Sequence, residues 1–304
     1  MPHWLIKASV QKIISALPAS QQLNTLLQRH VSGQLRLRPD FVADRLEHVS
    51  RHLHAYQEQH GQVPQRVLEI GTGWYPLVPL GLYLCGVSCI YSLDVQPLLQ
   101  IKQLHHLLAY LRRDLGRKRL TAMLPGLLPQ RLERLQVANR CHKLEQLGEA
   151  LGLFFINGDA RSLHFEDDHF DLIVSNNTFE HISPTVLAAM LPELQRVLRP
   201  GGIMSHYIDL VDHYSYFDSR LPAFHFLQYS QRAWKWIENP LQAQNRLRMP
   251  HYRELYRQAG IAIKKEINEH FPASSLPARG VHPDFGHIPP NDLLVAYTHI
   301  ISGK

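Results

Sequence analysis

Short apolar runs alternate with helical stretches through the middle of the chain. The runs have the length of buried strands and occupy residues 66–70, 89–93, 153–157, 171–175 and 203–208. Helical periodicity follows the first and the fourth run, over residues 77–85 and 184–197. Strand, helix and strand in succession are typical of β-α-β units, which build a parallel sheet. Two last strands are expected over residues 261–267 and 293–301.

The first sixty residues carry helical rather than strand periodicity. One apolar side of a helix over residues 4–17 is formed by Ile6, Val10, Ile13 and Leu17. Ser20 is a candidate N-cap for a second helix to about Val31, and a third helix is expected over residues 39–60. We therefore expect residues 1–60 to form a helical arm packed on residues 61–304. A lid, or a helix lying on a membrane surface, is the alternative for this arm.

Positive charge is concentrated in one connection of the chain. The net charge is +6, and residues 97–150 hold ten basic and four acidic residues, which account for all of it. Residues 97–152 are too many for a simple crossover, and helical patterns near 98–113 and 130–151 predict a basic helical insertion at about 112–151. Its charges are expected to form a solvated face, with an anionic membrane surface as the alternative. It lacks the interleaved aromatic residues that stack on bases, which disfavours a nucleic-acid partner.

Composition excludes several classes of protein. No apolar run reaches the roughly 18 residues of a membrane-spanning helix, and no leader pattern opens the chain. The three cysteines are Cys85, Cys89 and Cys141, a set too small and too irregular for a disulfide framework. We expect a cytoplasmic protein.

A glycine turn carries the first candidate chemistry. The strand before it runs into Gly71 and Gly73 at the start of a helix, an arrangement that brings backbone N–H groups close to a nucleotide. A dinucleotide site would have a third glycine where Pro76 stands, and Glu69 beside the turn would repel phosphates. A cofactor that has no phosphate and a positive centre would instead gain from this acid. Asp94 and Asp159 follow the next two strands, where carboxylates could bind hydroxyl or amino groups.

Five motifs in this order resemble those of the class I S-adenosylmethionine-dependent methyltransferases. They are residues 67–73, 91–94, 158–160, 170–182 and 198–202, within a matching stretch of about 63–210. The resemblance implies a Rossmann-like, doubly wound α/β fold of seven strands, mostly parallel with one antiparallel C-terminal strand. Tyr75 departs from the pattern, because it stands where the family has a third glycine.

The resemblance also implies S-adenosylmethionine as cofactor and a role for each motif residue. Gly71, Thr72, Gly73 and Asn176 would lie near the methionine part, with Glu69 near its amino group. Asp94 would hold the ribose hydroxyls, and Asp159 and Ala160 would bind the adenine. The chain would then be an enzyme of the methyltransferase class, EC 2.1.1.

Methyl transfer from a sulfonium is an in-line displacement that depends on positioning and on the exclusion of water. An oxygen acceptor also needs a base. His213, His181 and Asp209 are the catalytic candidates, because they follow strands four and five at the edge where ligands of parallel sheets bind. A loop with His282, Asp284 and His287 is a third group expected there. A metal at Asp209, Asp212 and His213 is an alternative, but no metal is expected.

We expect transfer to oxygen or nitrogen of a small or medium organic acceptor, with the aromatic-rich residues 213–249 helping to form its pocket. Asn176-Asn177-Thr178-Phe179 lacks the prolines of the adenine-N6 and glutamine-N5 methyltransferase motif, which disfavours a nucleic-acid base as acceptor. One alternative is a methyltransferase that acts on lipid or polymer at an anionic surface, with weak membrane contact. Another is a non-catalytic binding or partner protein with the same fold. A nicotinamide oxidoreductase is the third reading.

Overall fold

The computed structural model describes residues 3–15, 37–124, 126–239, 241 and 243–304. One seven-stranded sheet runs through it in the order β3-β2-β1-β4-β5-β7-β6. The strands are β1 Arg66–Ile70, β2 Cys89–Asp94, β3 Leu153–Asn157, β4 Phe170–Asn176, β5 Leu198–Asp209, β6 Ala262–His270 and β7 Val295–Gly303. Strand β7 pairs antiparallel with both β5 and β6, and the other pairs are parallel. The predicted Rossmann-like α/β fold is confirmed.

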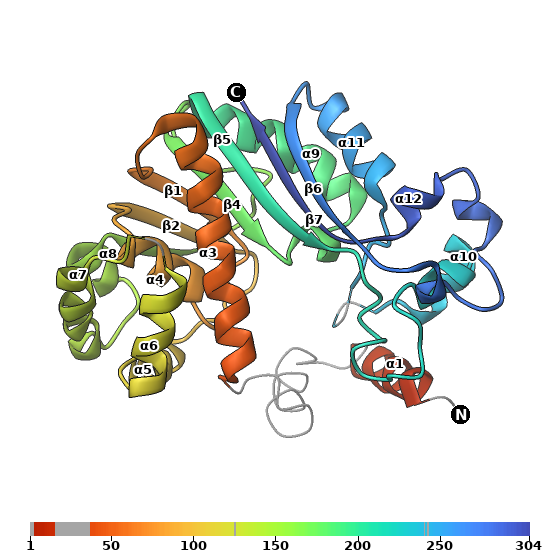
Figure 1. Ribbon diagram of the computed structural model, residues 1–304, viewed down its shortest axis with the longest axis horizontal. Helices are drawn as coiled ribbons and strands as arrows, with labels where there is room; N and C mark the ends of the chain where they lie inside the picture. Colours follow the sequence, from red (N-terminus) through yellow and green to blue (C-terminus); the bar gives the residue numbers. More distant parts are fainter. Residues whose placement is uncertain (1–2, 16–36, 125, 240, 242) are drawn as a thin grey trace.

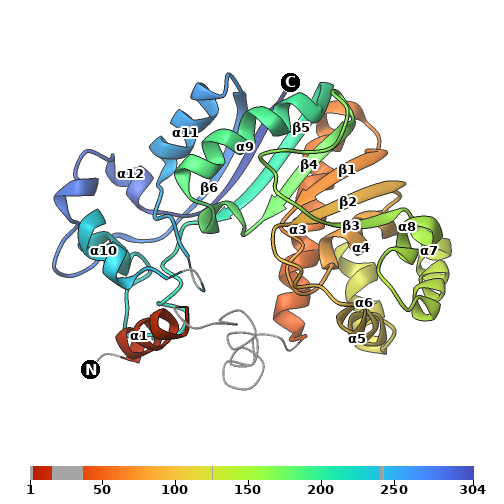
Figure 2. The ribbon, with the colours of Figure 1, turned by 180° about the vertical axis from the view of Figure 1, so that it is seen from behind.

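Helices cover both faces of the sheet (Figures 1 and 2). On one face lie α3 Pro39–His60, α4 Leu77–Leu84 and α5 Ile101–Leu111, and on the other lie α9 Pro184–Val197 and α11 Met249–Gln258. Successive strand residues point to opposite faces. Val67 and Ile203 therefore pack with the first set of helices, and their neighbours Leu68 and Met204 pack with the second.

Helix α3 is part of the main core. Its apolar side is fully buried and consists of Val42, Leu46, Val49, Leu53 and Tyr56. Proline at its first turn and the left-handed Gly61 after its last turn set its ends, as the sequence predicts. The division of the chain at residue 60 stays a prediction, since α3 packs directly against the sheet and α4.

The basic connection folds into several short helices at the β3 edge of the sheet (Figure 2). They are α5, α6 Asp114–Met123, α7 Pro129–Arg134, the 3-10 helix η2 Leu135–Arg140, and α8 Gln146–Leu151. A continuous helix over 130–151 is therefore wrong. The chain is extended at Cys141, and the side chain of Gln146 accepts the N–H groups of His142 and Lys143 there. The two bonds hold the turn that leads into α8.

Helix α1 His3–Ser15 packs beside α10 Gln231–Ile237, with its other side in solvent (Figure 1). Trp4 and Ala8 are buried, whereas Ile6, Val10 and Ile13 are 46%, 44% and 65% exposed. The helix is confirmed, but the apolar side read from the sequence is not the side that packs. Leu17 and the predicted helix from Ser20 to Val31 lie outside the described residues.

Residues 211–234 and 285–296 enclose a third, aromatic-rich core with α1. The short elements of the remaining chain are η3 Phe179–His181, η4 His225–Gln228, η6 Ala273–Ser275, η7 Pro283–Phe285 and α12 Pro290–Leu293. In the part of the chain that the structure describes, no helix is long and apolar enough to cross a membrane.

Candidate active site at the carboxyl ends of the strands

The glycine turn after β1 is pressed against the end of β4. Gly71 has a φ of +93°, and its N–H donates to the carbonyl of Leu93 at 2.8 Å. A Cβ at Gly71 would collide with the side chain of Thr178, so only glycine fits. Gly73 differs, because its φ is +62° but nothing lies within 4 Å of the place where a Cβ would stand. The turn is therefore closed toward β4 and open at Gly73.

Asp94 ties the end of β2 to this turn. Its Oδ2 accepts the N–H of Gly73 and its Oδ1 accepts the N–H of Gln96, both at 2.9 Å. Each carboxylate oxygen keeps a second lone pair for another donor. Asp94 thus lies where the sequence places it and is oriented by backbone groups.

Glu69 is buried below the turn, in a short chain of hydroxyl groups. The Ser92 hydroxyl donates to Glu69 Oε2 at 2.5 Å, and Thr72 Oγ1 lies 2.6 Å from Ser92 Oγ. Burial raises the pKa of Glu69 to about 8, against the lowering effect of the Ser92 bond and with a further rise from Asp94. A positive group placed beside Glu69 would favour its charged form.

Asn176, at the end of β4, is oriented from α3. His52 Nε2 lies 2.8 Å from Asn176 Oδ1, and His52 Nδ1 lies 2.7 Å from Ser205 Oγ. Because an amide oxygen only accepts, His52 donates through Nε2 and receives the Ser205 hydroxyl at Nδ1. The Nδ2 amide of Asn176 is buried and has no partner among the described residues. A buried donor held in this way, beside the glycine turn, is suited to bind a ligand.

Asp159 has a different setting from the other predicted cofactor residues. Its carboxylate is 42% exposed and forms a two-point ion pair with Arg161, with distances of 2.5 to 3.0 Å. The Arg161 guanidinium lowers the pKa of Asp159. The next residue, Ala160, is buried. Asp159 would have to share or leave Arg161 to bind an adenine amino group.

The catalytic candidates meet at the ends of β4 and β5. His213 Nε2 lies 3.3 Å from Asp209 Oδ2, and the same carboxylate oxygen accepts the Tyr216 hydroxyl at 2.8 Å. The ring of His181 lies 4.9 Å from that of His213. The fold therefore brings together the three side chains that the sequence predicts as catalytic candidates.

Asp212 and the late histidine loop do not join this group. Asp212 accepts from His225 at 3.1 Å and from the Tyr214 N–H at 2.8 Å, inside the third core. Asp284 accepts the N–H of Gln231 at 2.7 Å and so holds its loop to α10. Asp212 is consequently not a partner of Asp209 and His213, and the loop is engaged with α10.

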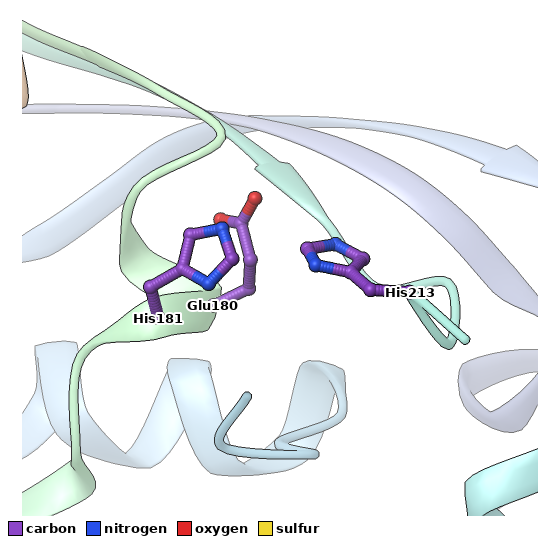
Figure 3. Close-up of side chains that lie close together, drawn as sticks. All are labelled: Glu180, His181 and His213. Atoms are coloured by element: carbon purple, nitrogen blue, oxygen red, sulfur yellow. The ribbon is translucent and has the colours of Figure 1, made fainter. Parts of the chain in front are cut away.

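Glu180 is the site residue that sequence reasoning missed. It is buried between His181 and Phe179, and in the described part of the chain neither carboxylate oxygen has a hydrogen-bond partner. Figure 3 shows its carboxylate facing His181 and His213. Burial and Asp209 raise the pKa of Glu180 well above its usual range. The only sequence signal was its place, within residues 170–182, directly before His181.

His181 combines access to solvent with a strongly perturbed imidazole. The residue is exposed, yet desolvation by the surrounding protein and the nearby His213 lower the pKa of His181 to about 4. Its Nδ1 lies 2.7 Å from the carbonyl of Ala243. A carbonyl only accepts, so Nδ1 carries the proton and the Nε2 lone pair is available.

A hollow of the surface lies at the opposite end of the sheet. It measures about 530 Å³ and is lined by Arg253, Arg257, Lys264, Lys265 and Glu266 with two isoleucines. Its place beside the start of β6 separates it from the carboxyl ends of the parallel strands.

Comparisons with known proteins find methyltransferases. Residues 130–205 match the family model described as a methyltransferase domain. A stretch of 55 residues is 44% identical to a probable phthiotriol/phenolphthiotriol dimycocerosates methyltransferase 2 of Mycobacterium ulcerans, covering 18% of this chain and 20% of that protein. Another of 60 residues is 40% identical to the mitochondrial 2-methoxy-6-polyprenyl-1,4-benzoquinol methylase of Gallus gallus, covering 20% and 19%. The chain thus spans about a fifth of the length of these relatives.

Two solved structures are similar to this chain at low sequence identity. A methyltransferase of Methanosarcina mazei is 16% identical, with a TM-score of 0.43 over 81% of this chain and 95% of that one. One of Leishmania major is 15% identical, with a TM-score of 0.43 over 98% and 82%. Residues 130–205 thus match a methyltransferase domain, and the ordered motifs and the strand order resemble those of the class I S-adenosylmethionine-dependent methyltransferases, whose methyl donor is S-adenosylmethionine.

Proposed function

We propose that this protein transfers a methyl group from S-adenosylmethionine to oxygen or nitrogen of an organic acceptor. The observation that supports this most is a single edge of the sheet where an open glycine turn meets unpartnered buried polar groups. Gly73 is open, and among the described residues neither the amide donor of Asn176 nor the carboxylate of Glu180 has a hydrogen-bond partner. Such groups are costly when buried unless a ligand completes them.

The residues around the turn fit the methyl donor. Asp94 would hold the ribose hydroxyls with the lone pairs that its backbone bonds leave free. Glu69 would lie by the positive amino group of the methionine portion, and Asn176 Nδ2 would donate to an acceptor atom of that portion, such as its carboxylate. Gly73 leaves room for the ligand to approach the backbone. When bound, S-adenosylmethionine supplies a methyl carbon made electrophilic by a positive sulfur.

The neighbouring cluster would prepare the acceptor. Asp209 Oδ2 lies 3.3 Å from His213 Nε2, and the Tyr216 hydroxyl donates to the same carboxylate oxygen. His213 would take the proton of an acceptor hydroxyl as the new bond to the methyl carbon forms and the bond from carbon to sulfur breaks. His181, with its free Nε2, is the second candidate for this proton.

The aromatic connection contributes less to an acceptor pocket than the sequence suggests. Phe224, Phe226 and Trp234 are buried in the third core. Tyr216 and Phe217 are 59% and 53% exposed and adjoin Asp209 through the Tyr216 hydroxyl. These two residues are the ones that would contact the acceptor.

Methyl-labelled donor, purified protein and a cell extract separated into small-molecule, lipid and polymer fractions test the proposal. We expect label in an organic fraction, and with an oxygen acceptor we expect His213→Gln to lower kcat about 100-fold or more. His282→Gln is the matched control, because His282 also lies 3.3 Å from an aspartate but at the loop held to α10. Donor binding without labelling of any fraction would favour the non-catalytic alternative.

A lipid acceptor at an anionic membrane surface is the second candidate, and α1 favours it. We define the α1 apolar patch as Ile6, Val10 and Ile13 of α1 with Phe217 and Trp236 beside it, residues that are 44% to 79% exposed. Apolar and aromatic groups of this kind insert at the boundary of a bilayer. The relatives named above act, by their names, on dimycocerosates and on a polyprenyl benzoquinol.

The charges around this patch suit anionic headgroups. The Lys12 ammonium group donates to the carbonyls of Lys235 and Trp236 at 2.9 and 2.8 Å. Lys7 Nζ lies 4.7 Å from the centroid of the Phe217 ring. Neither α1 nor α10 contains an acidic residue. The patch also adjoins the site, because Phe217 follows Tyr216, whose hydroxyl binds Asp209.

Vesicle sedimentation distinguishes this candidate from a small-molecule acceptor. We expect binding to phosphatidylcholine vesicles that contain phosphatidylglycerol, and loss of binding in the Ile6→Ser/Ile13→Ser variant. Val95→Ser/Val137→Ser is the control, since these residues are 69% and 40% exposed but lie outside α1 and α10. Equal binding of both double variants would rule out the α1 patch as the docking surface.

A further inference from the structure

We propose that Glu180, His181 and His213 form a binding site for one divalent transition-metal ion. Their candidate ligand atoms, one from each residue, lie within 4.8 Å of one another, and in the described ranges these residues form a group suited to a metal ion. Two imidazoles and a carboxylate favour ions such as Zn²⁺, Fe²⁺, Mn²⁺ and Co²⁺ over Ca²⁺ or Mg²⁺.

Glu180 is the first reason for a cation here. Its side chain is buried, and neither of its oxygens is bonded by any residue that the structure describes. In Figure 3 this carboxylate and the two rings face a common space, with His181 and Glu180 from η3 and His213 from the chain after β5. A buried carboxylate normally has a positive or hydrogen-bonding partner. A metal ion placed between the three side chains would supply it.

The surroundings of His181 match those of a metal ligand, and His213 has a ring nitrogen without a hydrogen bond. A ligating histidine usually donates its second ring N–H to a carbonyl or a carboxylate. His181 does so, because its Nδ1 donates to the Ala243 carbonyl at 2.7 Å and leaves Nε2 free. His213 Nε2 is buried without a hydrogen bond and lies 3.3 Å from Asp209 Oδ2, which adds a second carboxylate at the edge of the site.

The proposed metal binding and the proposed methyl transfer involve adjoining residues, but each can be tested without the other. A bound ion would polarise an acceptor hydroxyl and lower its pKa. It would also occupy a lone pair that His213 needs to act as a base. Addition of the ion would therefore change the pH profile of transfer, whereas the binding of the ion itself can be measured without donor or acceptor.

Titration of the metal-stripped full-length protein with Co²⁺, followed by visible absorption, tests the site. We expect saturation at one ion and at least tenfold weaker binding in both Glu180→Gln and His213→Ala. His54→Ala/Glu58→Gln is the matched control, because this exposed pair on α3 also joins a histidine and a glutamate, at 3.1 Å. It should bind Co²⁺ as the wild type does.

A second measurement uses the wild-type protein alone, so its result does not depend on whether the variants fold. Bound Mn²⁺ should broaden the imidazole proton resonances of His181 and His213 in the wild type and leave those of His54 sharp. Absence of saturable Co²⁺ binding, or affinities in Glu180→Gln and His213→Ala equal to that of the wild type, would overturn the proposal. Broadening of His54 rather than of His181 and His213 would overturn it as well.

Discussion

Two glycines of one turn have the same handedness of backbone but different surroundings. Gly71 cannot accept a Cβ because Thr178 fills the space, whereas Gly73 faces open space at a φ of +62°. Gly61, at the end of α3, has nearly the same conformation as Gly73, with a φ of +65° and nothing within 4 Å. Alanine at Gly61 or Gly73 would therefore carry a similar backbone cost, and a difference between them would report on the ligand.

We expect Gly73→Ala and Gly61→Ala each to lower the free energy of unfolding by roughly 1–2 kcal/mol, the cost of the left-handed conformation. Only Gly73→Ala should weaken the binding of S-adenosylmethionine, by tenfold or more, because its methyl group enters the ligand's space. Urea denaturation and calorimetry measure the two effects. Equal cofactor affinities in the two variants would place the ligand elsewhere.

Glu69 links stability to pH. Its folded pKa of about 8 lies above the ordinary value of 4.5, so its contribution to stability is present at low pH and is lost as pH rises toward 8. Between pH 5 and 7 the wild type should lose about 2–3 kcal/mol more than Glu69→Gln, which stays neutral and can keep the Ser92 bond. Urea denaturation at both pH values measures this difference. Parallel losses in the two proteins would contradict a buried neutral Glu69.

At the scale of elements, α3 connects the packing of the sheet to the site. A row of hydrogen-bonded polar side chains crosses the buried side of α3. Asn176 contacts His52, His52 contacts Ser205, and Ser205 Oγ lies 2.6 Å from His299 Nε2. Burial lowers the pKa of His52 well below its usual value, so the row is neutral and needs its hydrogen bonds complete. The helix thereby fixes a residue at the end of β4.

We expect His52→Ala to lower the free energy of unfolding by about 2–4 kcal/mol, because it removes a buried ring, takes the His52 partner from Asn176 Oδ1 and leaves Ser205 with His299. Binding of S-adenosylmethionine should weaken as well, since Asn176 loses its orientation. His48→Ala is the control, because His48 is equally buried on α3 but packs on Tyr207. If both variants bind the cofactor alike, α3 does not position Asn176.

At the scale of the whole molecule, the parts predicted from sequence are those that local patterns determine. The strand ends, the glycine turn and α3 can be predicted from residues that are close together in the sequence. Once the strand ends are known, Glu69 and Asp94 are placed at the carboxyl edge of the sheet. The cluster of Glu180 with His213 joins two distant segments, and no local pattern contains their contact. Asp209 and Asp212 are three residues apart, and only the bend after β5 separates the site residue from the core residue.

The sequence also does not predict which side of α1 packs against the rest of the protein. Its apolar residues lie at regular helical spacing, but the side that packs is chosen by the aromatic core at residues 211–234. Trp4 has its ring 4.6 Å from that of His225 and 5.5 Å from that of Tyr214, so it fixes the helix by one large contact. Ile6, Val10 and Ile13 are left for solvent or for another surface.

The central claim is that the methyl donor binds at the carboxyl ends of β1, β2 and β4. Hydrogen–deuterium exchange with and without S-adenosylmethionine tests it on the unmodified protein. We predict slower exchange over residues 70–74 and 94–97, where the N–H groups of Gly73 and Gln96 bond Asp94, with no change at the end of α3 near Gly61. Unchanged exchange at both segments at saturating donor, or protection confined to other elements, would contradict the account.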